Sequence, residues 1–157
     1  MKMKILNKLL LFLICPLIFI ADRITKLWAM YYIIPYNSIK VYSFFNISLK
    51  YNTGIAFSLF DNTIGKSQRW IFILISIVFS ILIIYSLNIL KYNIKLKIIL
   101  LFILGGILGN LYDRIFYGMV IDFLDLHYSI WHYATFNIAD VAICIGMGML
   151  ALLYNHD

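Results

Sequence analysis

The sequence predicts an all-α membrane protein: a four-transmembrane-helix bundle with a small extracytoplasmic β-rich loop region. Two observations support this prediction. Of the 157 residues, 64% are hydrophobic and 13% are charged, whereas soluble proteins average about 25% charged residues. The hydrophobic residues also gather into four runs, each close to the length of about 17 to 25 residues that crosses a bilayer as a helix. A chain of this length is expected to form a single integral membrane domain, residues 1–157.

The four apolar runs define the expected helices. The first resembles a secretory signal peptide because a lysine-bearing start precedes its apolar centre. No small-residue cleavage site follows it, so we expect it to remain as a helix. In the third run, Gly105 and Gly109 have the spacing that favours close packing against a neighbouring helix. The expected helices cover about residues 5–21, 70–90, 96–111 and 138–154.

Between the first two helices, residues 41–60 predict extended structure. The stretch VYSFFNISLKYNTGIAFSLF is rich in aromatic and β-branched residues that partly alternate with polar ones, which is typical of strands. Lysines set the expected orientation, because they are dense at the amino terminus and again between the second and third helices. The positive-inside rule places those two segments in the cytoplasm. The first loop carries basic residues at lower density, so both termini are expected inside and residues 41–60 outside.

The polar residues that could take part in a reaction all fall at the extracytoplasmic end of this topology. They come from the end of the first helix, the first outer loop, the end of the third helix, the second outer loop and the start of the fourth helix. A four-helix topology therefore brings them to one membrane face. The candidate site residues are Asp22, Lys26, Asn52, Gly54, Asn110, Asp113, Arg114, Asp122, Asn137 and Asp140.

Asp122 and Asp140 are the candidate catalytic pair. Asp140 lies three residues after Asn137, so the two share a helix face, and an acid at membrane depth indicates a functional site. Two carboxylates brought close together cannot both ionise readily. One would hold a proton and polarise a carbonyl, while the other would activate water, as in aspartic proteases. This chemistry requires no metal and no cofactor.

Several of these residues also have a purely structural interpretation. Asp113 and Arg114 could serve in ion pairing and helix capping. Asp22 and Lys26 are four residues apart, so they could form an ordinary stabilising pair on a helix. Asn137 could simply cap the last helix.

Other functions also remain open. One is a small ion- or proton-coupled carrier that binds its cation at Asp140, and another is a non-enzymatic helix-bundle subunit. Carriers commonly bind their substrates and ions near the bilayer midplane. Three of the four expected helices have few polar groups at their centres, which does not favour a carrier. His127, His132 and Asp125 suggest a metal site, yet their spacing fits no familiar zinc motif. The net charge of +6 does not indicate nucleic acid, because no basic cluster is interleaved with exposed aromatic residues.

Taken together, these motifs resemble the bacterial lipoprotein signal peptidase family, also called signal peptidase II. Five motifs carry the resemblance, and they follow one another in register over nearly the whole chain. One difference is Ile55, where the family motif commonly has alanine. The motifs are D-x-x-T-K from Asp22, N-x-G-x-A-F from Asn52, G-G-x-x-G-N-x-x-D-R from Gly105, V-x-D-F from Val120 and F-N-x-A-D from Phe136.

The resemblance implies an intramembrane aspartyl endopeptidase of the bacterial inner membrane. It would remove the signal peptide from diacylglyceryl-modified prolipoproteins by cutting just before the lipidated cysteine. The implied partners are these substrates and membrane lipids, without nucleic acid, and the implied state is a monomer. In this reading Asp122 and Asp140 are catalytic, Asn52, Asn110, Arg114 and Asn137 support the substrate backbone and the acids, and Asp22 and Lys26 hold the outer framework.

Two further expectations concern the outer loops. Residues 41–60 could hold the substrate peptide by strand-like pairing, and Gly54 would allow a turn or a close backbone approach. The segment from His127 to Tyr133 matches no motif of the family, so its role is left open.

Overall fold

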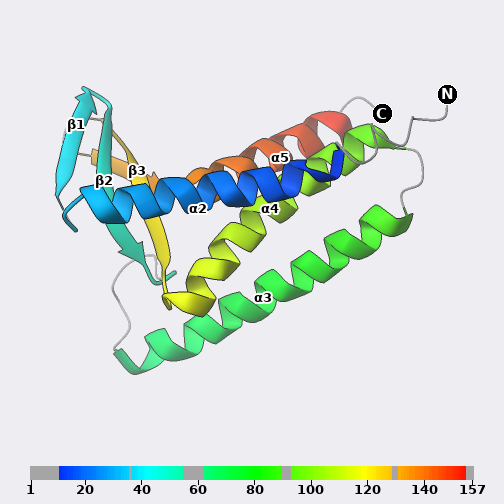
Figure 1. Ribbon diagram of the computed structural model, residues 1–157, viewed down its shortest axis with the longest axis horizontal. Helices are drawn as coiled ribbons and strands as arrows, with labels where there is room; N and C mark the ends of the chain where they lie inside the picture. The colour runs from blue at the N-terminus through cyan, green and yellow to red at the C-terminus, as the bar shows by residue number, and fades with distance from the viewer. Residues whose placement is uncertain (1–10, 36, 55–61, 90–92, 129–130, 155–157) are drawn as a thin grey trace.

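The computed structural model describes residues 11–35, 37–54, 62–89, 93–128 and 131–154, without the side chains of residues 62–67, 128 and 131–133. Helices α2, α4 and α5 pack against one another, and α3 packs against α4. A small sheet lies at one end of these helices (Figure 1). The described helices are α2 (Ile14–Tyr32), α3 (Asn62–Ile89), α4 (Ile94–Phe116) and α5 (Ile138–Tyr154).

Two of the described helices are long and apolar enough to cross a membrane, namely Gln68–Ile89 within α3 and the whole of α4. Helix α5 is apolar but shorter, with 17 residues. The bounds of α5 are the same as those of the helix expected at residues 138–154. Helices α3 and α4 are longer than the expected 70–90 and 96–111, because their ends include polar residues that a search for apolar runs leaves out.

The predicted end of the first helix was wrong. We expected it to cover residues 5–21, but α2 continues through the charged residues to Tyr32, while residues 5–10 lie outside the described part. The charges do not end the helix because they are paired inside the protein. Asp22 and Lys26 form an ion pair of 2.8 Å one turn apart, and neither side chain is exposed.

A four-stranded antiparallel sheet lies beside the end of α2. Its strands are β1 (Ser38–Tyr42), β2 (Phe45–Asn52), β3 (Val120–Tyr128) and β4 (Trp131–Phe136), in the order β1-β2-β3-β4. The first two strands confirm extended structure between the first two expected helices, although residues 55–60 of the expected segment lie outside the described part. A core of Ala29, Ile33, Leu49, Ile121 and Phe123 joins the sheet to α2.

Strands β3 and β4 correct the sequence-based expectation that Asp122 lies in a loop. Asp122 is on β3, where it is the register partner of Lys50 on β2. The segment from His127 to Tyr133, whose role was open, includes the ends of β3 and β4, with residues 129–130 outside the described part. Strand β3 pairs with β4, its neighbour in the chain, and with β2. The pairing with β2 joins segments far apart in the chain, so local residue patterns do not reveal it.

Glycines allow α4 to approach its neighbours closely, as the Gly105 and Gly109 spacing predicted. A Cβ atom at Gly105 would lie 3.0 Å from the backbone oxygen of Cys15 on α2. At Gly109 it would lie 2.7 Å from Oδ2 of Asp22 and 3.1 Å from Cβ of Ala139 on α5. The prediction of close packing is confirmed, and Gly109 marks the point where α2, α4 and α5 meet.

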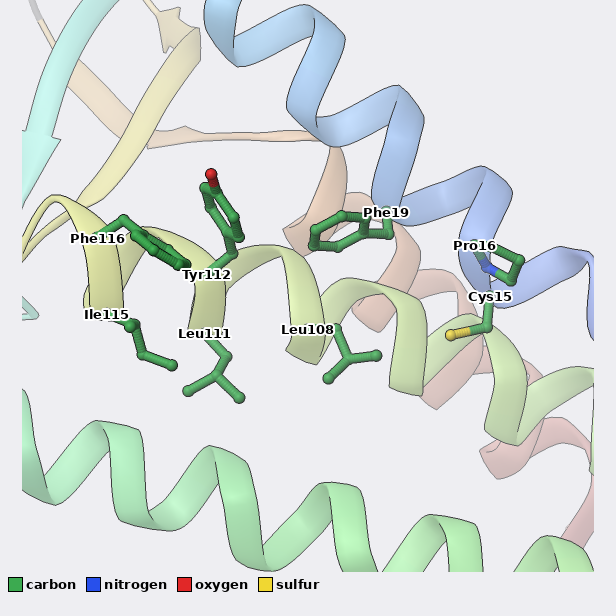
Figure 2. Close-up of a pocket in the computed structure, with 8 residues that line it drawn as sticks. All are labelled: Cys15, Pro16, Phe19, Leu108, Leu111, Tyr112, Ile115 and Phe116. Atoms are coloured by element: carbon green, nitrogen blue, oxygen red, sulfur yellow. The ribbon is translucent and has the colours of Figure 1, made fainter.

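An apolar cleft of about 430 Å³ opens between α2 and α4 (Figure 2). It does not contain the candidate site, because none of the candidate site residues lines it. The cleft is lined by Cys15, Pro16, Phe19, Leu108, Leu111, Tyr112, Ile115 and Phe116.

Candidate active site

Asn137 connects the two candidate acids. Its side-chain Nδ2 donates to Oδ1 of Asp122 at 2.7 Å. Its backbone N–H donates to Oδ2 of Asp140 at 3.2 Å, and its Oδ1 accepts the backbone N–H of Asp140 at 2.9 Å. Asn137 precedes the first residue of α5, so it is the helix cap that the sequence suggested. The same side chain that starts the helix therefore also links it to Asp122 on β3.

Asp122 is almost fully buried, with 2% of its surface exposed. Burial raises the pKa of its carboxyl group from 3.8 to about 6, and the nearby charge of Asp140 raises it as well. Hydrogen bonds from Asn52 and Asn137 act in the opposite direction, because they stabilise the ionised form. Desolvation outweighs these bonds, so Asp122 can hold a proton close to neutral pH.

Asp140 lies in the first turn of α5 and is half-buried. Its Oδ1 accepts a hydrogen bond of 2.8 Å from Nδ2 of Asn110 on α4. The orientation of the Asn110 amide is set by its other end, because Oδ1 accepts from Nζ of Lys26 at 3.1 Å and from Nδ2 of Asn137 at 3.1 Å. The amide nitrogen is therefore left to face Asp140.

Lys26 is fully buried, and its ammonium group has an acceptor for each of its three N–H donors. It pairs with Asp22 at 2.8 Å and Asp113 at 2.7 Å, and it donates to Asn110 at 3.1 Å. Burying a charge is costly unless it is paired and hydrogen-bonded, and here both conditions are met. Lys26 thus holds α2 to α4 and supports the amide that faces Asp140.

Arg23 completes an ion-pair cluster, which we define as Asp22, Arg23, Lys26 and Asp113. Its Nη2 lies 2.5 Å from Oδ1 of Asp113 and 3.7 Å from Oδ2 of Asp22. The cluster contains two acids and two bases, so its formal charge is zero. Its acids also hold backbone groups of the site, because Asp22 accepts the N–H of Ala139 and Asp113 accepts the N–H of Ile121.

Arg114 directly follows Asp113 on α4, but its side chain has a different environment. Its guanidinium group is half-buried and interacts electrostatically with Asp140 and Asp122, and also with Asp113. It also lies over the ring of Phe72 on α3, at 5.1 Å from the ring centroid. Asp113 is therefore part of the ion-pair cluster, whereas Arg114 contributes positive charge to the surroundings of the two acids.

Asn52 and Gly54 approach Asp122 from the end of β2. Nδ2 of Asn52 donates to Oδ2 of Asp122 at 3.0 Å, and Oδ1 of Asn52 accepts the N–H of Gly54 at 2.7 Å. Gly54 has a φ angle of +88°, which side chains other than glycine rarely adopt. A Cβ atom there would lie 2.5 Å from Cε2 of Phe72. The positive φ and the nearby Phe72 ring explain why the chain has a glycine at this bend, while a role of Gly54 towards the substrate stays a prediction.

The chain matches a known family over almost its whole length. The family model described as Signal peptidase (SPase) II matches residues 14–155. The chain belongs to the signal peptidase II family. Members of this family are aspartic peptidases, and the acids of this signal peptidase II that share Asn137 are Asp122 and Asp140.

Similar proteins agree with this assignment. A lipoprotein signal peptidase of Francisella tularensis subsp. novicida is 47% identical over 146 residues, covering 91% of this chain and 89% of the relative. One from Pseudoalteromonas atlantica is 40% identical over 136 residues, covering 86% and 82%. A bacterial membrane enzyme solved by the in meso method at 1.9 Å resolution has a TM-score of 0.79 at 28% identity, with 90% of each chain covered.

The metal alternative at His127, His132 and Asp125 falls partly on side chains outside the described part of the chain. His127 and His132 are register partners on β3 and β4. Among the described residues, no group of three or more His, Cys, Asp or Glu side chains could hold a metal ion. Asp125 is buried, and its Oδ1 lies 3.7 Å from Nζ of Lys50 and 3.5 Å from Oγ1 of Thr135.

Sequence reasoning missed three residues around the site of this signal peptidase II. Arg23 lies in the polar stretch from Asp22 to Lys26 that the sequence places at the end of the first helix, but it was not among the candidate site residues. Phe72 and Arg69 gave no comparable signal. Arg69 donates to the backbone oxygens of Arg114 and Ile115, each at 2.8 Å, but an arginine near the start of an apolar helix also fits an ordinary interfacial residue.

Proposed function

We propose that this signal peptidase II removes the signal peptide from diacylglyceryl-modified prolipoproteins, cleaving just before the lipidated cysteine, with Asp122 and Asp140 as the catalytic pair. The observation that carries the proposal is the pair of hydrogen bonds from Asn137, one to each acid. Asp122 has a pKa raised to about 6, so it is the acid that we assign the proton. Asp140 then acts as the base.

The reaction follows from these two roles. Protonated Asp122 donates a hydrogen bond to the scissile carbonyl oxygen, and Asp140 takes a proton from water as the water oxygen attacks the carbonyl carbon. The carbon–nitrogen bond then breaks, and the nitrogen of the lipidated cysteine takes the proton from Asp140. General acid–base catalysis of this kind contributes roughly 10²- to 10⁴-fold. The positive charge of Arg114 near both acids would stabilise the negative charge that develops on the carbonyl oxygen.

The supporting residues have roles that follow from their contacts. Asn52 and Asn110 each donate to one acid and would hold the two carboxylates apart from each other in fixed orientations. Lys26 fixes the Asn110 amide, while Asp22 and Asp113 balance the charge of Lys26. Gly54 lets the end of β2 approach α3 closely. The exposed edge strand β1 is available for pairing with an extended substrate peptide.

The membrane topology belongs to the same proposal. We assign four spans to the single domain, with both termini in the cytoplasm of a bacterial inner membrane and the acids near the extracytoplasmic face, in a monomer. The support is that the acids lie where the helices meet the sheet, at one end of the two apolar helices. A lipidated cysteine anchors the scissile bond near the headgroups, so the acids need that depth. Membership of a peptidase family favours this proposal over the cation carrier.

The experiment that tests the proposal is cleavage of a diacylglyceryl-modified precursor peptide by the purified protein in detergent. The variants Asp122→Asn and Asp140→Asn should fold normally and lose cleavage, while a chelator should leave the unmodified protein active. Cleavage retained in either variant would contradict the assignment of Asp122 and Asp140 as the catalytic pair. Loss of cleavage with chelator alone would favour the metal alternative at the histidines.

A further inference from the structure

The ring of Phe72 is close to Gly54 and to the guanidinium group of Arg114. Each of these residues is connected to the candidate acids by further interactions. On one side the ring is close to Gly54, where a Cβ atom would lie 2.5 Å from Cε2 of the ring. It also lies under the guanidinium of Arg114, 5.1 Å from the ring centroid. Gly54 leads to Asp122 through Asn52, and Arg114 interacts electrostatically with Asp122 and Asp140.

Helix α3 thus holds Arg114 at two points. Arg69 donates to its backbone oxygen at 2.8 Å, and Phe72 lies against its guanidinium group. A guanidinium over an aromatic face is attracted by the ring electrons, and the attraction strengthens when the pair is shielded from water. Arg114 is half-buried. The guanidinium also donates from Nη1 to the backbone oxygen of Asn110, but over a long distance of 3.5 Å, so without the ring its long side chain would be held less firmly beside the acids.

We propose that Phe72 is a positioning residue of the reaction: its ring keeps the Arg114 guanidinium beside Asp122 and Asp140 and sets the position of the Gly54 turn. This inference rests on the proposed roles of the two acids. Phe72 touches neither acid in the contacts described, so it acts through Arg114. Its main effect is therefore on kcat, because the charge of Arg114 is most useful when negative charge develops during the reaction.

The test compares Phe72→Leu with Phe79→Leu, which makes the same change seven residues further along α3, at a side chain that is 53% exposed. Phe72→Leu should lower kcat about threefold to thirtyfold, the range of a cation–π contact, with KM near that of the unmodified protein. Phe79→Leu should leave both unchanged. Phe72→Tyr retains an aromatic face and should restore kcat. If Phe72→Leu does not fold, Phe72→Met replaces it.

Coupling to Arg114 separates positioning from general destabilisation. In an Arg114→Gln background the charge is absent, so Phe72→Leu should have little further effect on kcat. An equal loss in both backgrounds, a loss confined to KM, or no rescue by Phe72→Tyr would overturn the role of Phe72. If Asp122→Asn abolishes cleavage while Phe72→Leu has normal kinetics, only this inference fails. If Asp122→Asn retains cleavage, the proposed function fails and this inference fails with it.

Discussion

Asn137 and Asp140 exchange hydrogen bonds: the backbone N–H of each donates to the side-chain oxygen of the other, at 3.2 Å from Asn137 and 2.9 Å from Asp140. This is the reciprocal geometry of a capping box at the start of a helix. Asn137 has a third role, because its Nδ2 donates to Asp122 at 2.7 Å. The start of α5 and the arrangement of the two acids are therefore set by the same residue.

Replacing Asn137 with alanine should lower kcat by about 10²- to 10³-fold, comparable to the loss of one preorganised donor in other hydrolases. The change removes the donor to Asp122 and the acceptor for the Asp140 N–H. Kinetics on a lipidated precursor peptide would measure it, with Asn88→Ala as the control, because Asn88 is exposed on α3 and donates to the backbone oxygen of Ile84 in its own helix. Equal activity in the two variants would contradict the bridging role.

The pH dependence of kcat/KM should follow Asp122. Its pKa is raised from 3.8 to about 6, and the proposed mechanism needs its protonated form. Activity attributable to this proton should therefore fall as pH rises through about 6. Substrate that excludes water from the acids should move the corresponding fall in kcat to a higher pH. A rise in kcat/KM through pH 6 would show that ionised Asp122 is the active form.

Stability should depend on the same group, with a sign that follows from the raised pKa. The folded protein binds the Asp122 proton more tightly than the unfolded chain does, so this contribution to stability is complete below about pH 4 and is lost as pH rises through about 6. The difference in unfolding free energy between the unmodified protein and Asp122→Asn should therefore change between these pH values. Unfolding in mixed micelles would measure it, and a constant difference would contradict the raised pKa.

Replacing Lys26 with methionine should destabilise the protein by about 3 to 5 kcal/mol, as expected when one member of a buried ion pair is removed. Asp22 and Asp113 would remain buried with Arg23 as their shared cation. Unfolding in mixed micelles would measure the loss, with Lys40→Met on the exposed strand β1 as the control. A loss no larger than that of the control would mean that the ion-pair cluster contributes little to stability.

Replacing Gly54 with alanine should impair turnover, because the residue combines a φ of +88° with the close Phe72 ring. Gly118→Ala is a matched control. Gly118 has a similar φ of +80°, but a Cβ atom there would lie 3.4 Å from its nearest contact, the guanidinium of Arg69. Both variants carry backbone strain of roughly 1 to 3 kcal/mol, so only a larger loss of kcat/KM in Gly54→Ala would support a role for the close approach.

The convergence of the polar residues could be predicted from the sequence, because counting helix crossings places segments at one end whatever their separation in the chain. The last helix was also predictable, since an uninterrupted apolar run begins at Val141, shortly after the cap residue Asn137. Strand β3 was not. Its pairing with the adjacent strand β4 begins only at Leu124, whereas Asp122 is paired with Lys50 on β2, and a partner so distant in the chain leaves no local pattern at Asp122.

The length of the first described helix was missed for a related reason. In the sequence, Asp22 and Lys26 look like a surface ion pair at the end of a membrane span. In the structure both side chains are buried, because Lys26 also pairs with Asp113 on α4. Whether a charge ends an apolar helix depends on a partner from another helix. The positions of Arg69 and Phe72 depend in the same way on α4, so composition alone could not identify them.

The dual use of Asn110 and Asn137 has a consequence for inhibitor resistance. Both amides orient the acids, and both also join elements of the fold, Asn110 through Lys26 and Asn137 through the start of α5. A substitution of either asparagine that prevents a drug from binding would lower both the activity of the enzyme and the stability of its fold. Escape mutations against a compound anchored on the two amides should therefore arise at the rim of the binding region, where side chains serve a single purpose.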